Sequence, residues 1–227
     1  MSRTNKQEID FYFDYISHNA YLAWHILLEM TNKYGYSVRC VPVLFAGFLK
    51  ASGQLGPAEI APKADWMNRN NLRKARLAGI PFSAPKLHPF NPLFLLRLTA
   101  QDMPEVDRSR ITDRLLRAVW VDGIDPNDRD AIGACLTEIN IAAGPLIAAT
   151  GQDTAKVQVK NNTEEAIARG AFGVPTMIVA DEVFWGYDDL TYLEGVLAGR
   201  DPLKNVDTDL EQYFTGWESA RAAGQHR

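Results

Sequence analysis

Ser17 is the first residue whose type and position could do chemistry. It follows a β-prone segment, Ile9 to Phe13, and precedes a helical pattern, so the sequence predicts a strand-to-helix turn there. Serine is a strong helix N-cap because its hydroxyl accepts hydrogen bonds from unpaired backbone amides. The same hydroxyl would lie in the positive field of a helix N-terminus, which favours an anion such as a thiolate. The residues alone leave both roles open.

Val174 and Pro175 form a second candidate site, directly before the β-prone run Thr176 to Val179. Proline cannot donate to a sheet ladder, so it marks the first residue of a strand, an edge or a cis turn. A cis bond would free the backbone N–H and C=O of Val174 to pair with an extended peptide ligand. A trans proline that simply begins the strand is the alternative.

The composition excludes several classes of partner. The chain has 227 residues, of which 46% are hydrophobic and 23% charged, with a net charge of −4. Nucleic-acid binding needs a concentrated basic surface, so we expect no nucleic-acid partner. The basic run Arg69 to Arg76 is interpreted as a solvated helix face. The polar N-terminus lacks an apolar signal core and no apolar run could cross a bilayer, so we expect a cytoplasmic protein without a membrane partner.

The elements that position these residues follow from periodicity and turn signals. Two β-prone runs, Ile9–Phe13 and Ser37–Pro42, flank an amphipathic helix at about Asn19–Tyr34, which indicates a parallel pair with a crossover. Residues 46 to about 170 are helical in pattern. The predicted helices there are Ala46–Ser52, Pro62–Ala78, Pro92–Thr99, Val106–Val121, Arg129–Ile139, Ala142–Thr150 and Thr154–Gly170. A hairpin of Thr176–Val179 and Glu182–Trp185 and a helix at about Tyr187–Leu197 close the order.

This order, βαβ, a helical block, then ββα, predicts an α/β thioredoxin-like fold with an all-helical domain inserted in its middle. The expected boundaries are 8–45 and 154–203 for the two thioredoxin-like halves and 46–153 for the insert. Residues 204–227 are polar and are expected to form a short helix or a frayed tail.

The cysteines exclude dithiol chemistry at the first helix. A redox-active thioredoxin fold needs Cys-x-x-Cys there, whereas this chain has Ser17-His18-Asn19-Ala20. Cys40 and Cys135 are far apart, and Cys40 is expected to be a buried free thiol. Neither the cysteines nor the histidines have metal-ligand spacing, so we expect no metal site.

The ordered motifs resemble a known family. The segment from Phe13 to Ala23, the run Gly173-Val174-Pro175-Thr176, and Trp185-Gly186 followed by Asp188 resemble motifs of the 2-hydroxychromene-2-carboxylate isomerases. These are relatives of the kappa-class glutathione transferases. The resemblance covers about residues 8–203 and includes intermediate motifs such as His88-Pro89-Phe90-Asn91-Pro92.

The resemblance implies glutathione as cofactor and a role for each matching residue. Ser17 would hydrogen-bond the glutathione sulfur, and Val174-Pro175 would pair with the cysteinyl backbone. Asp188 would receive the γ-glutamyl ammonium group, and the backbone N–H of Tyr187 its carboxylate. Lys63 would contact the glycyl carboxylate, with an exposed helix lysine as the alternative. Gln54 occupies the place of an Asn ligand of the transferases, and Asn70 or Asn71 that of an Asp ligand.

The largest departure from the family pattern is His18-Asn19, where the family usually has proline and an aromatic residue. His18 could exchange protons near the sulfur, since imidazole titrates near neutrality, but an exposed first-turn histidine is the favoured interpretation. His88 is expected to be structural. Aromatic residues that could line a substrate pocket are Trp66, Phe90, Trp120 and Trp185.

The sequence therefore predicts a glutathione-dependent isomerase that acts on an aromatic or conjugated small molecule. A kappa-like glutathione transferase or peroxidase is the second interpretation, and a glutathione-binding or non-catalytic thioredoxin-like module the third. The family forms dimers, and the apolar stretches Leu93–Leu96 and Leu115-Leu116 suggest a homodimer interface. A monomer in which those helices pack within the chain is the alternative.

Overall fold

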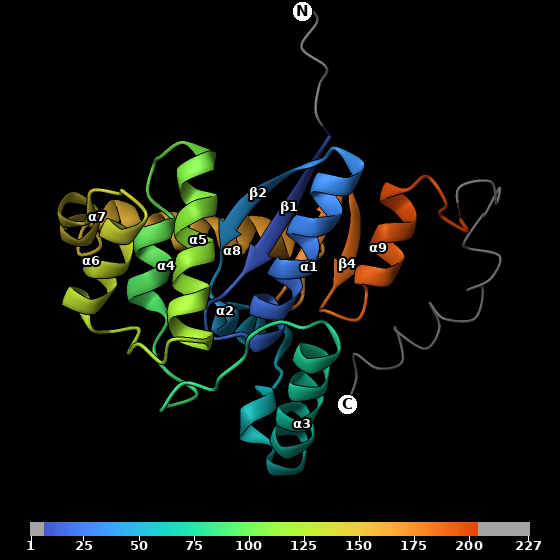
Figure 1. The fold of residues 1–227 in the computed structure, drawn as a ribbon, viewed down its shortest axis with the longest axis horizontal. Helices are drawn as coiled ribbons and strands as arrows, with labels where there is room; N and C mark the ends of the chain where they lie inside the picture. The colour runs from blue at the N-terminus through green and yellow to red at the C-terminus, as the bar shows by residue number, and fades with distance from the viewer. Residues whose placement is uncertain (1–6, 204–227) are drawn as a thin grey trace, which may run out of the picture. The chain divides into compact units, whose positions relative to one another are not determined.

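A four-stranded sheet organises residues 7–203, the part of the chain that this computed structural model describes (Figure 1). Its strands are β1 (Glu8–Phe13), β2 (Ser37–Pro42), β3 (Thr176–Val179) and β4 (Glu182–Trp185), in the order β2-β1-β3-β4. β1 runs parallel to β2 and antiparallel to β3, and β3 and β4 form an antiparallel hairpin. This topology confirms the thioredoxin-like order read from the sequence.

The helices follow the predicted bounds within a few residues. α1 (His18–Tyr34) makes the crossover between β1 and β2, and it ends at Gly35, whose φ of 78° is left-handed. The helical block between β2 and β3 consists of α2 (Phe45–Ser52), η1 (Pro57–Glu59), α3 (Ala61–Leu77), α4 (Leu93–Thr99), α5 (Glu105–Trp120), α6 (Arg129–Glu138), α7 (Ala143–Ala149) and α8 (Asp153–Ala168). The short 3₁₀ turn η1 was not predicted, and α9 (Leu190–Leu197) begins three residues later than expected.

The two faces of the sheet carry different cores. Phe11 points to the α1 side, where its ring lies 5.4 Å from that of Trp24. Tyr12 points to the opposite side, where it packs in a buried cluster with Phe48 of α2 and Ala166 of α8. The alternation of side chains along a strand therefore buries β1 on both faces, with α1 in front of the sheet and α8 behind it in Figure 1.

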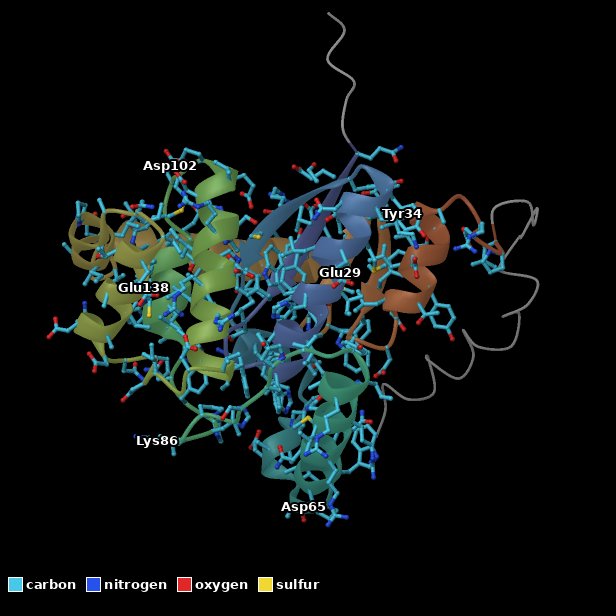
Figure 2. All side chains as sticks on the ribbon, viewed as in Figure 1. Glu29, Tyr34, Asp65, Lys86, Asp102 and Glu138 are labelled. Atoms are coloured by element: carbon cyan, nitrogen blue, oxygen red, sulfur yellow. The ribbon has the colours of Figure 1, made fainter. Side chains whose placement is uncertain are left out.

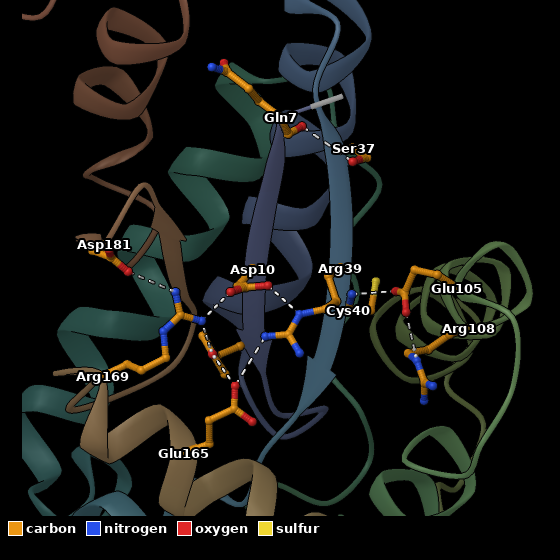
Figure 3. A network of polar contacts seen from close by, with 11 residues as sticks. Gln7, Asp10, Ser37, Arg39, Cys40, Glu105, Arg108, Glu165, Arg169 and Asp181 are labelled. Atoms are coloured by element: carbon orange, nitrogen blue, oxygen red, sulfur yellow. Dashed lines mark hydrogen bonds and ion pairs between the residues drawn. The ribbon is translucent and has the colours of Figure 1, made fainter. Parts of the chain in front are cut away.

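An ion-pair network ties α8 to the sheet on the second face (Figure 3). Asp10 of β1 accepts a hydrogen bond from Arg39 of β2 at 2.5 Å and another from Arg169, the residue that caps α8. Arg39 also pairs with Glu165 at 3.3 Å. Burial alone would raise the pKa of Asp10, but the two arginines outweigh it and lower the pKa.

The helical stretches expected to form a dimer interface are instead buried within the chain. Leu95, Leu96, Leu115 and Leu116 each have no exposed surface, because α4 and α5 pack on each other. That basis for the dimer expectation was wrong. The large apolar side chains that remain exposed in the helical block include Trp66 and Leu77 of α3, at 59% and 90%.

Residues up to Leu190 form one compact unit, and a second unit begins at Thr191 and includes most of α9. The predicted subdivision at residues 45, 153 and 203 stays a prediction. The expectation for residues 204–227 lies outside the described residues. No helix in the described part of the chain is long and apolar enough to cross a membrane.

Candidate active site

Ser17 lies where the sequence predicts it, at the N-cap of α1. Its backbone is extended, with φ −94° and ψ 110°, and its Oγ accepts a hydrogen bond from the Ala20 amide at 3.1 Å. In the described part of the chain, its hydroxyl donates only to the carbonyl oxygen of Val174, at 3.5 Å. A contact at this limiting distance is weak, so the hydroxyl proton remains available for a stronger acceptor.

Asp14 fixes the turn that presents Ser17. Its buried carboxylate accepts one hydrogen bond from the Ile16 amide at 3.1 Å and one from the Phe45 amide, at the start of α2, at 2.9 Å. Burial raises the pKa of Asp14 to about 7, although both hydrogen bonds act to lower it. The side chain therefore joins the turn before α1 to the first residue of α2, a role that the sequence analysis missed.

Val174 and Pro175 face Ser17 from the other half of the fold. The bond between them is cis, as predicted, and the carbonyl of Pro175 accepts a hydrogen bond from the Gly186 amide at 2.8 Å. Gly173 is needed here because a Cβ atom on it would lie 2.6 Å from Nε1 of Trp185. The loop before β3 is thus pressed against the end of β4, which brings the two C-terminal motifs together.

His18 is buried, which corrects the expectation of an exposed first-turn histidine. It is 7% exposed, and its ring lies 5.6 Å from that of His88 and 5.5 Å from that of Trp120. His88 bonds the Ile16 carbonyl through Nε2 at 2.9 Å, and Trp120 donates to the Tyr15 carbonyl at 2.9 Å. The rings of His88 and Trp120 belong to the helical block, and their hydrogen bonds fix the turn before α1. This agrees with the structural role expected for His88.

The protonation state of His18 follows from its contacts. Its Nδ1 accepts a hydrogen bond from the Asn19 amide at 3.1 Å, so a neutral ring carries its proton on Nε2. Burial, with the nearby His88 and Lys74, lowers the pKa of His18 to about 3. The imidazole is accordingly neutral at physiological pH, and its Nε2–H is a buried donor without a partner among the described residues.

Lys74 is a second site residue that the sequence analysis missed. Its Nζ donates to Oδ2 of Asp188 at 2.8 Å and to Oδ1 of Asn19 at 3.4 Å, and it lies 5.0 Å from the centre of the Tyr187 ring. The side chain is only 11% exposed. The interpretation of the run that contains it as a solvated helix face was therefore wrong at this position, and α3 joins the site through Lys74.

Comparisons with known proteins identify the family of this chain. Residues 8–198 match the model of the DSBA-like thioredoxin domain. A 2-hydroxychromene-2-carboxylate isomerase of Pseudomonas sp. (strain C18) is 31% identical over 194 residues, which are 84% of this chain and 90% of that protein. The chain belongs to the 2-hydroxychromene-2-carboxylate isomerase family of DSBA-like thioredoxin proteins.

Structural similarity extends over the same region. The solved structure of a 2-hydroxychromene-2-carboxylate isomerase superposes with a TM-score of 0.79 at 28% identity, covering 88% of this chain and 98% of that one. A kappa 2 glutathione S-transferase of Caenorhabditis elegans is 24% identical over 209 residues, 86% of this chain and 93% of the relative. The family resemblance and the fold class expected from the motifs are confirmed.

Two residues that the family resemblance suggested as glutathione ligands, Lys63 and Gln54, do not contact the other candidate ligands. Lys63 is exposed in the first turn of α3, at the end of the helix where Figure 2 labels Asp65. A rise of 1.5 Å per residue puts it about 16 Å along the helix from Lys74. Gln54 is exposed in the loop after α2. No contact of either side chain with Ser17, Val174 or Asp188 is recorded, and their roles as ligands stay predictions.

Asn71 of this family member has an unusual environment. It lies one turn before Lys74 on the face of α3 that packs against α1, and it has no exposed surface. Within residues 7–203, neither its Nδ2 nor its Oδ1 has a hydrogen-bond partner. Among the described residues, no group of three or more His, Cys, Asp or Glu side chains is placed to hold a metal ion.

Proposed function

We propose that this chain is a glutathione-dependent isomerase of the 2-hydroxychromene-2-carboxylate type, and that Ser17 is its catalytic residue. The observation that carries the proposal is the hydroxyl of Ser17, held at the N-terminus of α1 and facing the backbone of Val174. A thioredoxin-like fold with a hydroxyl in place of its cysteine has no protein nucleophile at this point. It can still stabilise a thiolate that another molecule brings.

The residues around Ser17 fit glutathione. The carbonyl of Val174 has only the weak contact with Ser17, so the backbone there can pair with the cysteinyl residue of the tripeptide. The exposed carboxylate of Asp188 can receive the γ-glutamyl ammonium group, with the amide of Tyr187 next to it. Lys63 would contact the glycyl carboxylate, and Gln54 would take the place of the Asn ligand of the transferases. When bound, glutathione would supply the thiol that adds reversibly to a conjugated substrate.

The protein's own groups then have defined tasks. Ser17 Oγ accepts from the Ala20 amide and can donate its proton to a sulfur anion, and the N-terminus of α1 adds its positive field. Both interactions favour the charged form and lower the pKa of a thiol. His18 does not exchange protons at neutral pH, because its ring is buried and uncharged. We assign it the task of packing Trp120 against the turn.

A kappa-like glutathione transferase or peroxidase is the second candidate, favoured by the match to the kappa 2 transferase of C. elegans. It would use the same thiolate site on a different electrophile. A non-catalytic binding module is the third candidate, because the family's proline and aromatic residue after the serine are replaced by His18 and Asn19.

Absorbance assays with the purified protein separate these candidates. We expect isomerisation of 2-hydroxychromene-2-carboxylate only when glutathione is present, and little conjugation of 1-chloro-2,4-dinitrobenzene. The reverse preference would favour the transferase. Binding of glutathione by calorimetry with no turnover of either substrate would favour the module, and absence of glutathione binding would refute the proposed function.

We further propose that the protein works as a homodimer in the cytoplasm. Exposed apolar side chains on α3, such as Trp66 and Leu77, support an interface between copies. Two buried cysteines that form no disulfide are consistent with a reducing compartment.

A further inference from the structure

Lys74 and Asp188 present opposite charges side by side near the N-terminus of α1. Nζ of Lys74 lies 2.8 Å from Oδ2 of Asp188. The lysine side chain is 11% exposed and the aspartate side chain 77%, so solvent and ligands reach the pair mainly at the carboxylate. Lys74 comes from α3 and Asp188 from the loop after β4, and no single motif contains both.

The ammonium group of Lys74 is held in place by three neighbours. Besides Asp188, it donates to Oδ1 of Asn19 at 3.4 Å and lies over the ring of Tyr187, 5.0 Å from its centre. These contacts fix the long lysine side chain, so little conformational entropy remains to be lost when a ligand binds. The pair is therefore a preorganised feature of the site.

A simple ion suits this pair poorly. An amine that approached Asp188 would also meet the positive charge of Lys74, and a carboxylate that approached Lys74 would meet the negative charge of Asp188. An α-amino-acid head carries both charges on neighbouring groups. It can lie antiparallel to the pair, with its ammonium on Asp188 and its carboxylate on Lys74.

We propose that Lys74 and Asp188 together form a subsite for the α-amino-acid head of the γ-glutamyl residue, in which Lys74 binds the α-carboxylate. This inference rests on the proposed function, because it takes glutathione as the ligand. It adds a side-chain cation to the end of the site where the sequence motifs supply only Asp188 and the amide of Tyr187. It also makes α3, a helix of the block between β2 and β3, part of cofactor recognition.

Calorimetry with three tripeptides tests the subsite directly. The probes are glutathione, its 4-aminobutanoyl analogue, which lacks the α-carboxylate, and its glutaryl analogue, which lacks the α-ammonium. The unaltered protein should bind glutathione about tenfold or more tightly than either analogue, the scale of one lost charge-assisted hydrogen bond. This comparison needs no variant and so does not depend on how a mutant folds.

The Lys74→Met variant assigns the carboxylate contact. It should bind glutathione about tenfold or more weakly than the unaltered protein, yet bind the 4-aminobutanoyl analogue no more weakly. Asp188→Asn should show the reciprocal pattern, with a larger loss for glutathione than for the glutaryl analogue. Arg73→Met is the matched control, because it removes a positive charge from the exposed face of the same helix and should leave all three affinities unchanged.

Several outcomes would overturn the subsite. Glutathione bound as tightly or more tightly by Lys74→Met would show that the lysine only competes for Asp188. An equal loss for glutathione and the 4-aminobutanoyl analogue would show that Lys74 does not contact the carboxylate. Failure of the unaltered protein to bind any of the three probes would instead refute the proposed function itself, and this subsite with it.

Discussion

Ser17 combines a structural and a chemical task in a single hydroxyl group. Its oxygen satisfies the Ala20 amide in the first turn of α1, and its proton is committed only to a 3.5 Å contact with Val174. The oxygen performs the first task and the proton the second. One substitution removes both, and the two losses can be told apart because they affect different measurements to different extents. Loss of the cap lowers stability, whereas loss of the proton removes stabilisation of a developing anion.

Ser17→Ala should lower turnover far more than it lowers stability. We expect turnover to fall about ten- to a thousandfold, the scale of a lost anion-stabilising donor. The free energy of unfolding should fall by about 1 kcal/mol, the usual effect of losing an N-cap. Steady-state kinetics and denaturant unfolding measure the two effects. Ser52→Ala on α2 is the control, because that hydroxyl donates only to carbonyls of its own helix. Unchanged turnover in Ser17→Ala would exclude the catalytic role of Ser17.

His18 should make stability depend on pH in a definite window. Its pKa is about 3 in the folded protein, whereas an ordinary histidine side chain has a pKa of 6.5, so between these values the unfolded chain binds a proton that the folded chain does not. The stability contributed by the neutral ring is therefore complete above pH 6.5 and is lost progressively as the pH falls toward 3. His18→Gln should flatten the fall in stability over this range, measured by urea unfolding at several pH values. Parallel curves for the two proteins would contradict the assignment.

At the scale of the elements, the position of the loop before β3 and that of the end of β4 are linked by the close contact between Gly173 and Trp185. The indole nitrogen lies only 2.6 Å from the position that a Cβ on Gly173 would occupy, and the Trp185 ring also contacts that of Phe172, with centres 5.1 Å apart. Glycine at this position is required by close approach rather than by backbone conformation. The position of Trp185 therefore sets how the backbone around Val174 meets the Trp-Gly-Tyr-Asp segment.

Gly173→Ala should displace Trp185 and disturb the site. We expect the free energy of unfolding to fall by about 1 kcal/mol, at the low end for overpacking because Trp185 is half-exposed. Tryptophan fluorescence should change, and glutathione binding should weaken. Gly144→Ala in α7 is the matched control, since a Cβ there meets nothing within 4 Å. That change should be neutral or stabilise by up to about 1 kcal/mol.

Local signals were sufficient to predict most elements. The β-prone runs, glycine C-caps and helical periodicity located the strands and α-helices of residues 7–203 within a few residues, because these features act over short stretches of chain. The turn around Ser17 and the cis Val174-Pro175 bond were also predicted from nearby residues. The short 3₁₀ turn at Pro57–Glu59 was missed because three residues carry too little periodicity to be recognised.

The environment of a side chain was predicted less well, because it depends on tertiary contacts. Lys74 is 55 residues from Asn19 and 114 from Asp188 in the chain, and no local pattern distinguishes it from its exposed neighbours. The burial of His18 depends on His88 and Trp120, which come from a loop and a helix of the helical block between β2 and β3. Composition and periodicity contain no information about these tertiary contacts.

At the scale of the whole molecule, α3 is the main candidate for contact between copies of the chain. Trp66 and Leu77 are exposed, and their spacing of eleven residues puts them on one face of the helix. The apolar side chains of α4 and α5, two other helices of the block, are buried within the chain.

Sedimentation at micromolar concentration should give a species of twice the chain mass of 25.3 kDa. Trp66→Lys should shift this species toward a monomer, because a charge in an apolar interface is costly. Thr137→Lys, at an exposed position on α6, is the control and should leave the dimer intact. A species of one-chain mass with full glutathione-dependent turnover would rule out an obligate dimer.

The two cysteines bear on how this protein would respond to alkylating reagents. Cys40 is 2% exposed and Cys135 is 1% exposed, and burial raises the pKa of both thiols. A thiol activated beside Ser17 would be ionised and open to solvent, whereas both protein thiols would be neutral and covered. Iodoacetamide should therefore consume glutathione at the site well before it adds mass to the folded chain, so the rate of its consumption would report the state of the bound thiol without interference from the protein.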